Sequence, residues 1–211
     1  MSCSTAKFKL KEANYFLEKI KSQEVQVDED ALTFNLNAFV IAANSVIEYV
    51  ESDFVYVMIE PRINWREWRY EKPRNDILEN HEQSKALNNF REFYLKQKKE
   101  LLDIPLVNYF RYKRNKIAHR RWDGIKSASW TEDSDGKKTS SNIRLESGYL
   151  LDRASNDPTY DMDICTFEIP REKQIELCTI LYQEYAIPIL EEYIQHLQDF
   201  IKKFEGKDFF N

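Results

Sequence analysis

The chain has 211 residues and a mass of 25.3 kDa, with 42% hydrophobic residues, 14% aromatic residues and a formal net charge of −5. This composition excludes a disordered chain, and the length fits one domain with a sizeable core. No apolar run approaches the length that spans a bilayer, and the N-terminus lacks the apolar stretch of a signal peptide. The three cysteines, Cys3, Cys165 and Cys178, have no metal-ligand spacing and leave an odd thiol, so we expect a cytoplasmic protein without a metal or other cofactor.

Helical spacing dominates the first quarter of the chain. Residues 6–22 place apolar side chains at helical intervals, namely Phe8, Ala13, Phe16, Leu17 and Ile20. Residues 29–51 form the most apolar segment, and a helix that is apolar on so much of its circumference must be buried on several sides. We predict a second helix there, either at the centre of a bundle or at a dimer contact, because small residues would let a neighbouring backbone approach closely.

The next segments are less uniform. FVYVMIEP at 54–61 could be a strand or a continuation of the preceding helix, and we predict irregular structure over residues 54–80. Helical spacing resumes with Leu87, Phe90, Tyr94 and Leu101 and ends near Asp103. Asp103 is predicted to be the N-cap of the following helix, with Pro105 inside its first turn.

The composition changes to Ser, Thr, Asp and Gly after residue 122, and helical periodicity is lost until about residue 170. We interpret residues 123–169 as an insertion in a single domain that spans residues 1–211. A turn signal at 134–136 and a strand-like run at 162–169 predict a small antiparallel sheet. Residues 171–203 predict a last long helix with a kink at Pro188. The predicted fold is therefore mainly α, an up-and-down helical bundle with a small antiparallel β insertion before the last long helix.

The strongest functional signal is RYKRNKIAHRR at residues 111–121. This stretch holds six Arg or Lys residues and no acidic residue, in a chain whose overall charge is negative, so a polyanion could bind there. Within this stretch, Arg114 and Asn115 form an adjacent pair and His119 follows at a fixed spacing. The remaining cations are the candidate substrate-binding residues: Arg111, Lys113, Lys116, Arg120 and Arg121.

Helical geometry constrains how this segment could work. At about 100° per residue, Asn115 and His119 lie nearly above one another, whereas Arg114 lies roughly 140° from His119. Convergence of Arg114 and His119 would need a long Arg side chain reaching around, a local break, or a symmetry-related second subunit. Arg114 also continues an otherwise apolar stripe, so its charge needs a partner. Glu48 and Asn44, four residues apart on the second helix, are the candidate supporting residues.

The Arg114–His119 spacing, with Asn115 directly after the Arg, resembles the R-x-x-x-x-H motif of the HEPN superfamily. The order of an early helix, a second apolar helix and the motif late in a further helix resembles small HEPN proteins over roughly residues 6–121 and 170–205. The resemblance implies a two-fold homodimer whose composite site receives the motif from both chains. It also implies metal-independent RNA cleavage to a 2′,3′-cyclic phosphate and a 5′-hydroxyl. His119 would act as general acid or base on the ribose 2′-hydroxyl, Arg114 would stabilise charge on the phosphate, and Asn115 would orient His119 or bind a phosphate oxygen.

The expected function is therefore a HEPN-type endoribonuclease in a toxin or antiviral-defence setting. Its expected partners are RNA, a second copy of the chain and an antitoxin or defence-system protein, with no membrane. Two alternatives stay open. One is a non-catalytic HEPN-like module that binds RNA or a protein partner through the same groove, and the other is a purely structural dimerisation protein. The motif itself could also lack a functional role and form the solvent-exposed face of an ordinary basic helix.

Overall fold

A computed structural model describes residues 1–22, 28–58, 83–119 and 185–209, together with 125–127, 130–132, 138–140, 143–145 and the helical positions 172, 175, 177 and 179–181. At 55–58, 83–84, 116, 118–119 and in the strands before residue 141, the description covers the backbone alone. The irregular structure predicted for 59–80 and the strand predicted at 162–169 lie outside the described residues.

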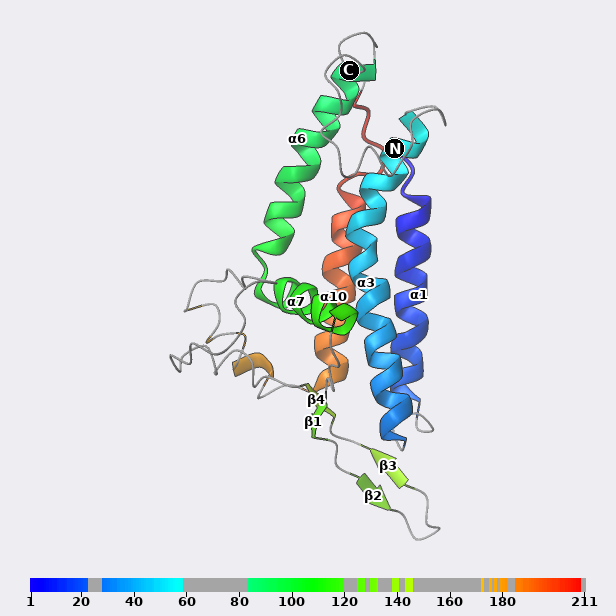
Figure 1. Cartoon of the computed structure of the whole chain (residues 1–211), viewed down its shortest axis with the longest axis vertical. Helices are drawn as coiled ribbons and strands as arrows, with labels where there is room; N and C mark the ends of the chain where they lie inside the picture. The colour runs from blue at the N-terminus through cyan, green and yellow to red at the C-terminus, as the bar shows by residue number, and fades with distance from the viewer. Residues whose placement is uncertain are drawn as a thin grey trace.

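Five helices form the body of the described chain. They are α1 (Ser4–Lys21), α3 (Glu29–Met58), α6 (Gln83–Leu102), α7 (Pro105–His119) and α10 (Ala186–Lys202). Figure 1 shows α1, α3 and α10 running together along the long axis, with α6 at the side away from α1 and α7 lying across the others. The mainly α fold predicted from the sequence is confirmed.

α1 and α3 form an antiparallel hairpin that is joined by a buried carboxylate. Cys3 occupies the N-cap position of α1 and makes no side-chain cap bond. Asp53 of α3 caps the helix instead. Its carboxylate accepts hydrogen bonds from the backbone N–H groups of Thr5 and Ala6, both at 2.9 Å to Oδ2. Asp53 is 5% exposed. The first amides of a helix lack carbonyl partners, so this carboxylate fixes the start of α1 onto α3.

α3 is the central apolar helix that the sequence predicted. Apolar residues at helical spacing along it are buried, namely Leu32, Leu36, Phe39, Ala43, Val46 and Val50. The helix continues to Met58, so the irregular structure predicted from residue 54 is wrong at 54–58. The expectation that no apolar run could span a bilayer is also wrong, since Glu29–Phe54 is long and apolar enough by length and composition. Half of that stretch is buried inside the protein, as in the core helix of a helical bundle.

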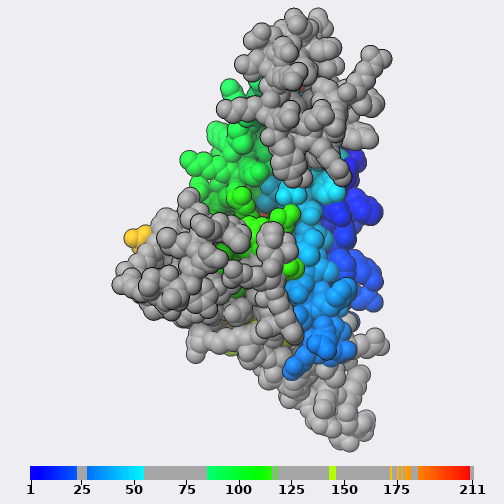
Figure 2. Space-filling view, in the orientation of Figure 1, coloured from blue at the N-terminus to red at the C-terminus, as the bar shows by residue number. Residues whose placement is uncertain are grey.

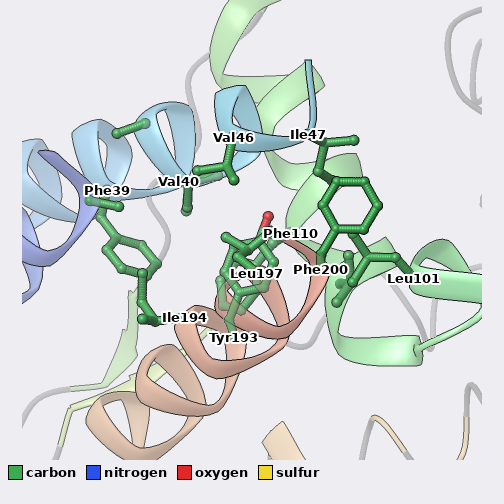
Figure 3. Close-up of a cluster of buried hydrophobic side chains, with 14 of the residues drawn as sticks. Phe39, Val40, Val46, Ile47, Leu101, Phe110, Tyr193, Ile194, Leu197 and Phe200 are labelled. Carbon is green, nitrogen blue, oxygen red and sulfur yellow. The ribbon is translucent and has the colours of Figure 1, made fainter. Parts of the chain in front are cut away.

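The core joins α3 to α7 and α10 through aromatic rings. Phe110 of α7 stacks on Tyr193 of α10 with ring centroids 4.6 Å apart, and Phe39 of α3 meets both rings edge-on. Figure 3 shows these side chains converging between the three helices, with Val40 and Leu197 beside them. Close packing at this junction sets where α7 crosses the bundle.

The described part of the insertion forms two short antiparallel pairs rather than one sheet. β1 (Ile125–Ser127) pairs with β4 (Arg144–Leu145), and β2 (Trp130–Glu132) pairs with β3 (Lys138–Ser140). The turn signal at 134–136 lies between β2 and β3, where the sequence placed it. Beside β4, the carbonyl of Ile143 accepts a hydrogen bond from the N–H of Ala186 at 2.8 Å, so the insertion contacts the first residue of α10.

The predicted kink at Pro188 is wrong in position. α10 begins at Ala186, because Tyr185 has an extended backbone with φ −81° and ψ 159°. Pro188 is therefore the third residue of the helix, where a missing N–H costs no intrahelical hydrogen bond. Tyr185, just before the helix, is 41% exposed, whereas the apolar side chains that follow at helical spacing are buried: Ile189, Tyr193, Leu197, Phe200 and Phe204.

Candidate functional site

α7, which carries the motif, starts one residue later than predicted. Its first helical residue is Pro105, and the carbonyl of Ile104 accepts a hydrogen bond from the N–H of Asn108 at 3.1 Å. Ile104 therefore occupies the N-cap position that the sequence analysis gave to Asp103. Proline still stands where it is best tolerated, because the first helical N–H has no intrahelical partner. The helix has no acidic residue from Pro105 to His119.

Buried contacts fix α7 against α3 one turn before the motif. Val107 and Phe110 are fully buried, and the side-chain amide of Asn44 donates to the carbonyl of Phe110 at 3.2 Å as well as to that of Val40 at 2.9 Å. Asn44 was predicted to support Arg114, but this amide nitrogen binds the helix backbone instead. A guanidinium carries only N–H donors, so it cannot accept a hydrogen bond from the Asn44 amide nitrogen. A helix carbonyl can accept that bond because its oxygen has a second lone pair. Asn44 thus positions the motif through the backbone.

Arg114 lies where α7 crosses α3. Its Nη2 is 3.5 Å from Oε1 of Glu48, and its Nη1 donates to Oδ1 of the adjacent Asn115 at 3.3 Å. The ion pair predicted between Glu48 and Arg114 is therefore present. The two side chains are 37% and 38% exposed, and such a half-exposed pair contributes about 0.2–1 kcal/mol. The guanidinium can therefore exchange the carboxylate for a phosphate at small cost.

The other cations of the motif divide into three groups. Arg111 is exposed. Lys113 is fully buried, and its ammonium group lies 5.1 Å from the centroid of the Tyr109 ring, so its assignment as a substrate-binding residue is corrected. The side chains of Lys116 and His119 lie outside the described residues, as do Arg120 and Arg121. The approach of Arg114 to His119 therefore stays a prediction.

α6 carries a further set of cations that was not predicted from the sequence. Four of them are exposed along one helix that immediately precedes α7: Lys85, Arg91, Lys96 and Lys99. The signal was the run KQKK at 96–99, which a charge-pattern search finds but which resembles any solvated helix face. In the described part of the chain, no three His, Cys, Asp or Glu side chains lie close enough together to hold a metal ion.

Comparison of the chain with protein-family models, with curated proteins and with solved structures finds no match in any of the three. The resemblance to the HEPN superfamily thus depends on the motif residues and on the order of the helices. Site geometry, rather than kinship, has to carry the functional argument.

Proposed function

We propose that the protein is a metal-independent endoribonuclease of the HEPN type. The observation that carries this proposal is the placement of Arg114, which is half-exposed at the crossing of α3 and α7 on a helix without acidic residues. The Glu48 carboxylate and the Asn115 amide oxygen hold the guanidinium from two directions. A cation that is aimed but weakly paired suits the stabilisation of charge that develops on a phosphate.

The proposed chemistry is an internal attack. His119 removes the proton from the ribose 2′-hydroxyl, the 2′-oxygen attacks the adjacent phosphorus, and the bond to the 5′-oxygen breaks. Arg114 binds the phosphate oxygens as their charge grows, the 5′-oxygen leaves with a proton taken from water, and His119 returns the proton it accepted to the solvent. The products are a 2′,3′-cyclic phosphate and a 5′-hydroxyl. DNA lacks the 2′-hydroxyl and is not cleaved.

The same proposal includes a homodimer with the site at its interface. Support comes from α3, whose outward side exposes 68% of Phe34 and 45% of Ile41. Ser45 and Glu48 follow Ile41 on that helix at intervals of four and three residues, so the apolar side leads toward Arg114. A second copy that covers Phe34 and Ile41 would bring its own motif near this one. We place the protein in the cytoplasm, in a toxin or antiviral-defence setting, with an antitoxin or defence-system protein as a further partner.

The test is incubation of wild type, His119→Ala and Arg114→Ala with a labelled structured RNA in EDTA. His196→Ala on α10 is the matched control. Cleavage by wild type and His196→Ala alone, with cyclic-phosphate ends, supports the proposal. Equal cleavage by His119→Ala would exclude His119 as the acid or base, and loss of all cleavage in EDTA with recovery on adding Mg²⁺ would exclude the metal-independent mechanism.

The second candidate function is a non-catalytic HEPN-like module that binds RNA or a protein. Its support is the Glu48–Arg114 ion pair itself, because a paired guanidinium can serve to hold α7 on α3 without any substrate. This function predicts RNA or protein binding that is unchanged in His119→Ala, together with no cleavage by wild type. Measuring binding and cleavage on the same RNA separates the two candidates.

A further inference from the structure

Within the described residues, the exposed cations of α6 have no acidic partners. Lys85, Arg91, Lys96 and Lys99 are exposed, and none of them takes part in an ion pair or hydrogen bond within the described chain. The lysines of α1 differ, because three of the five are paired with carboxylates: Lys7 with Glu205, Lys9 with Glu12, and Lys21 with Glu18 and Glu191. Unpaired cations thus gather on α6 although the protein as a whole is acidic.

These cations lie on the solvent-exposed side of the helix. Lys96 and Lys99 follow Lys85 by 11 and 14 residues, which are close to three and four helical turns, whereas Arg91 lies about 120° around the helix from Lys85, at the edge of the exposed side. The opposite face is buried through Leu87, Phe90, Tyr94 and Leu101. Figure 2 shows α6 open to solvent along one edge of the molecule. We call Lys85, Arg91, Lys96 and Lys99 the α6 cationic face.

The acidic residues of α6 do not cancel this charge. Glu100 forms an ion pair with Lys203, with 3.2 Å between Oε2 of Glu100 and Nζ of Lys203. Glu92 is exposed within the α6 cationic face, so four cations stand against one carboxylate. The described side chains of this face therefore carry a net positive charge. Its complement is a ligand with several negative charges in a row.

The helix that carries these cations directly precedes the helix of the proposed site. α6 ends at Leu102 and α7 begins at Pro105, with Ile104 and the exposed Asp103 between them, and α7 adds the exposed Arg111 before Arg114 without an acidic residue of its own. Figure 1 shows α7 starting at the end of α6 and crossing toward α3. A ligand that follows α6 to its end therefore reaches the start of the helix that carries Arg111 and Arg114.

We propose that the α6 cationic face is a docking track for the sugar-phosphate backbone of the RNA whose scissile phosphate binds at Arg114. This inference depends on the proposed function for the identity of the ligand as RNA. Lys85 to Lys99 spans about 21 Å at 1.5 Å per residue. One strand places a phosphate roughly every 3.4 Å when stacked, so the face spans about six phosphates. The substrate class is therefore an RNA that extends well beyond the cleaved bond, and a very short oligonucleotide fills the site without the track.

The experiment compares two triple variants in the His119→Ala background, so that RNA stays intact during binding. The first is Arg91→Glu/Lys96→Glu/Lys99→Glu on the α6 cationic face. The matched control is Lys11→Glu/Lys19→Glu/Lys202→Glu, which makes the same change in net charge on α1 and α10. Binding of fluorescein-labelled single-stranded RNAs of about 24 and about 6 nucleotides is measured by anisotropy as a function of salt. Circular dichroism of both triples checks that the helices are retained.

For the longer RNA, the α6 triple is expected to raise Kd on the order of tenfold at low salt and to reduce the slope of log K against log salt by about two. The control triple and the short RNA should change much less. Equal effects of the two triples, or no effect of either, would overturn the track. The track and the ribonuclease function fail separately: α6-dependent binding without cleavage by wild type leaves the track and removes the enzyme. Cleavage at the wild-type rate by the same α6 triple with His119 retained leaves the enzyme and removes the track. Failure of wild type to bind any RNA would overturn both.

Discussion

Replacing Glu48 by Gln tests whether the Arg114 guanidinium is held weakly enough to bind a phosphate. The substitution keeps the shape of the side chain and removes one negative charge 3.5 Å from Nη2 of Arg114. Both side chains are more than one-third exposed, so solvent screens the pair and its contribution is about 0.2–1 kcal/mol. We therefore expect the free energy of unfolding to fall by no more than about 1 kcal/mol.

The effect on RNA binding should have the opposite sign. In wild type, a phosphate at Arg114 must displace or repel the Glu48 carboxylate, and the glutamine variant removes that competition. The gain cannot exceed the strength of the pair by much, so it is at most about 1 kcal/mol, which is roughly a fivefold decrease in Kd. Higher salt should shrink the difference, because both the competing pair and the phosphate contact are screened.

The assay is anisotropy of a labelled RNA with His119→Ala protein, arranged as a double-mutant cycle with Arg114→Ala. Glu48→Gln should tighten binding when Arg114 is present and have no effect when Arg114 is absent. Glu51→Gln is the control, because Glu51 lies on the same helix and makes no ion pair in the described chain. Weaker binding in Glu48→Gln would refute the reasoning and show that Glu48 must orient Arg114. Equal tightening by Glu51→Gln would mean that net charge alone is responsible.

Three further predictions concern the framework of the site, each followed by urea denaturation or thiol labelling. Asp53→Ala should lower the free energy of unfolding by about 1–3 kcal/mol, because two N-terminal amides of α1 lose their acceptor, whereas Asp30→Ala at an exposed position should change it by less than about 0.5 kcal/mol. Tyr193→Phe should be neutral or stabilising by about 1 kcal/mol, since the buried hydroxyl has no hydrogen-bond partner in the described chain. Tyr94→Phe loses a hydrogen bond to the carbonyl of Ile47 and should lower the free energy of unfolding by about 1 kcal/mol. A larger loss of stability in Tyr193→Phe than in Tyr94→Phe would contradict this. Burial raises the pKa of the Cys3 thiol to about 11. In protein without the other two cysteines, iodoacetamide at pH 8 should therefore label Cys3 only after unfolding. The thiol should also contribute stability below its ordinary pKa near 9.0, and that contribution should be lost as the pH rises through about 11.

The sequence by itself determined the approximate positions of the helices and the positive charge of α7. Apolar spacing is a local property, so it placed α1, about three-quarters of α3, α6 and the end of the last helix close to their observed positions, but not the start of the last helix at Ala186. The run from Arg111 to Arg121 likewise revealed its cations and its lack of acidic residues without any structure. The β2–β3 pair followed from a turn signal between its strands.

Tertiary structure decided which groups meet across the sequence. Glu48 and Arg114 are 66 residues apart, and nothing local distinguishes the Glu that pairs with Arg114 from the Asn one turn away that binds the backbone instead. Packing also buried Lys113 among cations that look alike in the sequence. Asp53 became the cap of a helix that begins some fifty residues earlier, because the α1–α3 hairpin brings its carboxylate to those amides. Periodicity records which face of a helix is buried, but the partner of a charge depends on how separate helices cross, and that depends on the fit of the whole core.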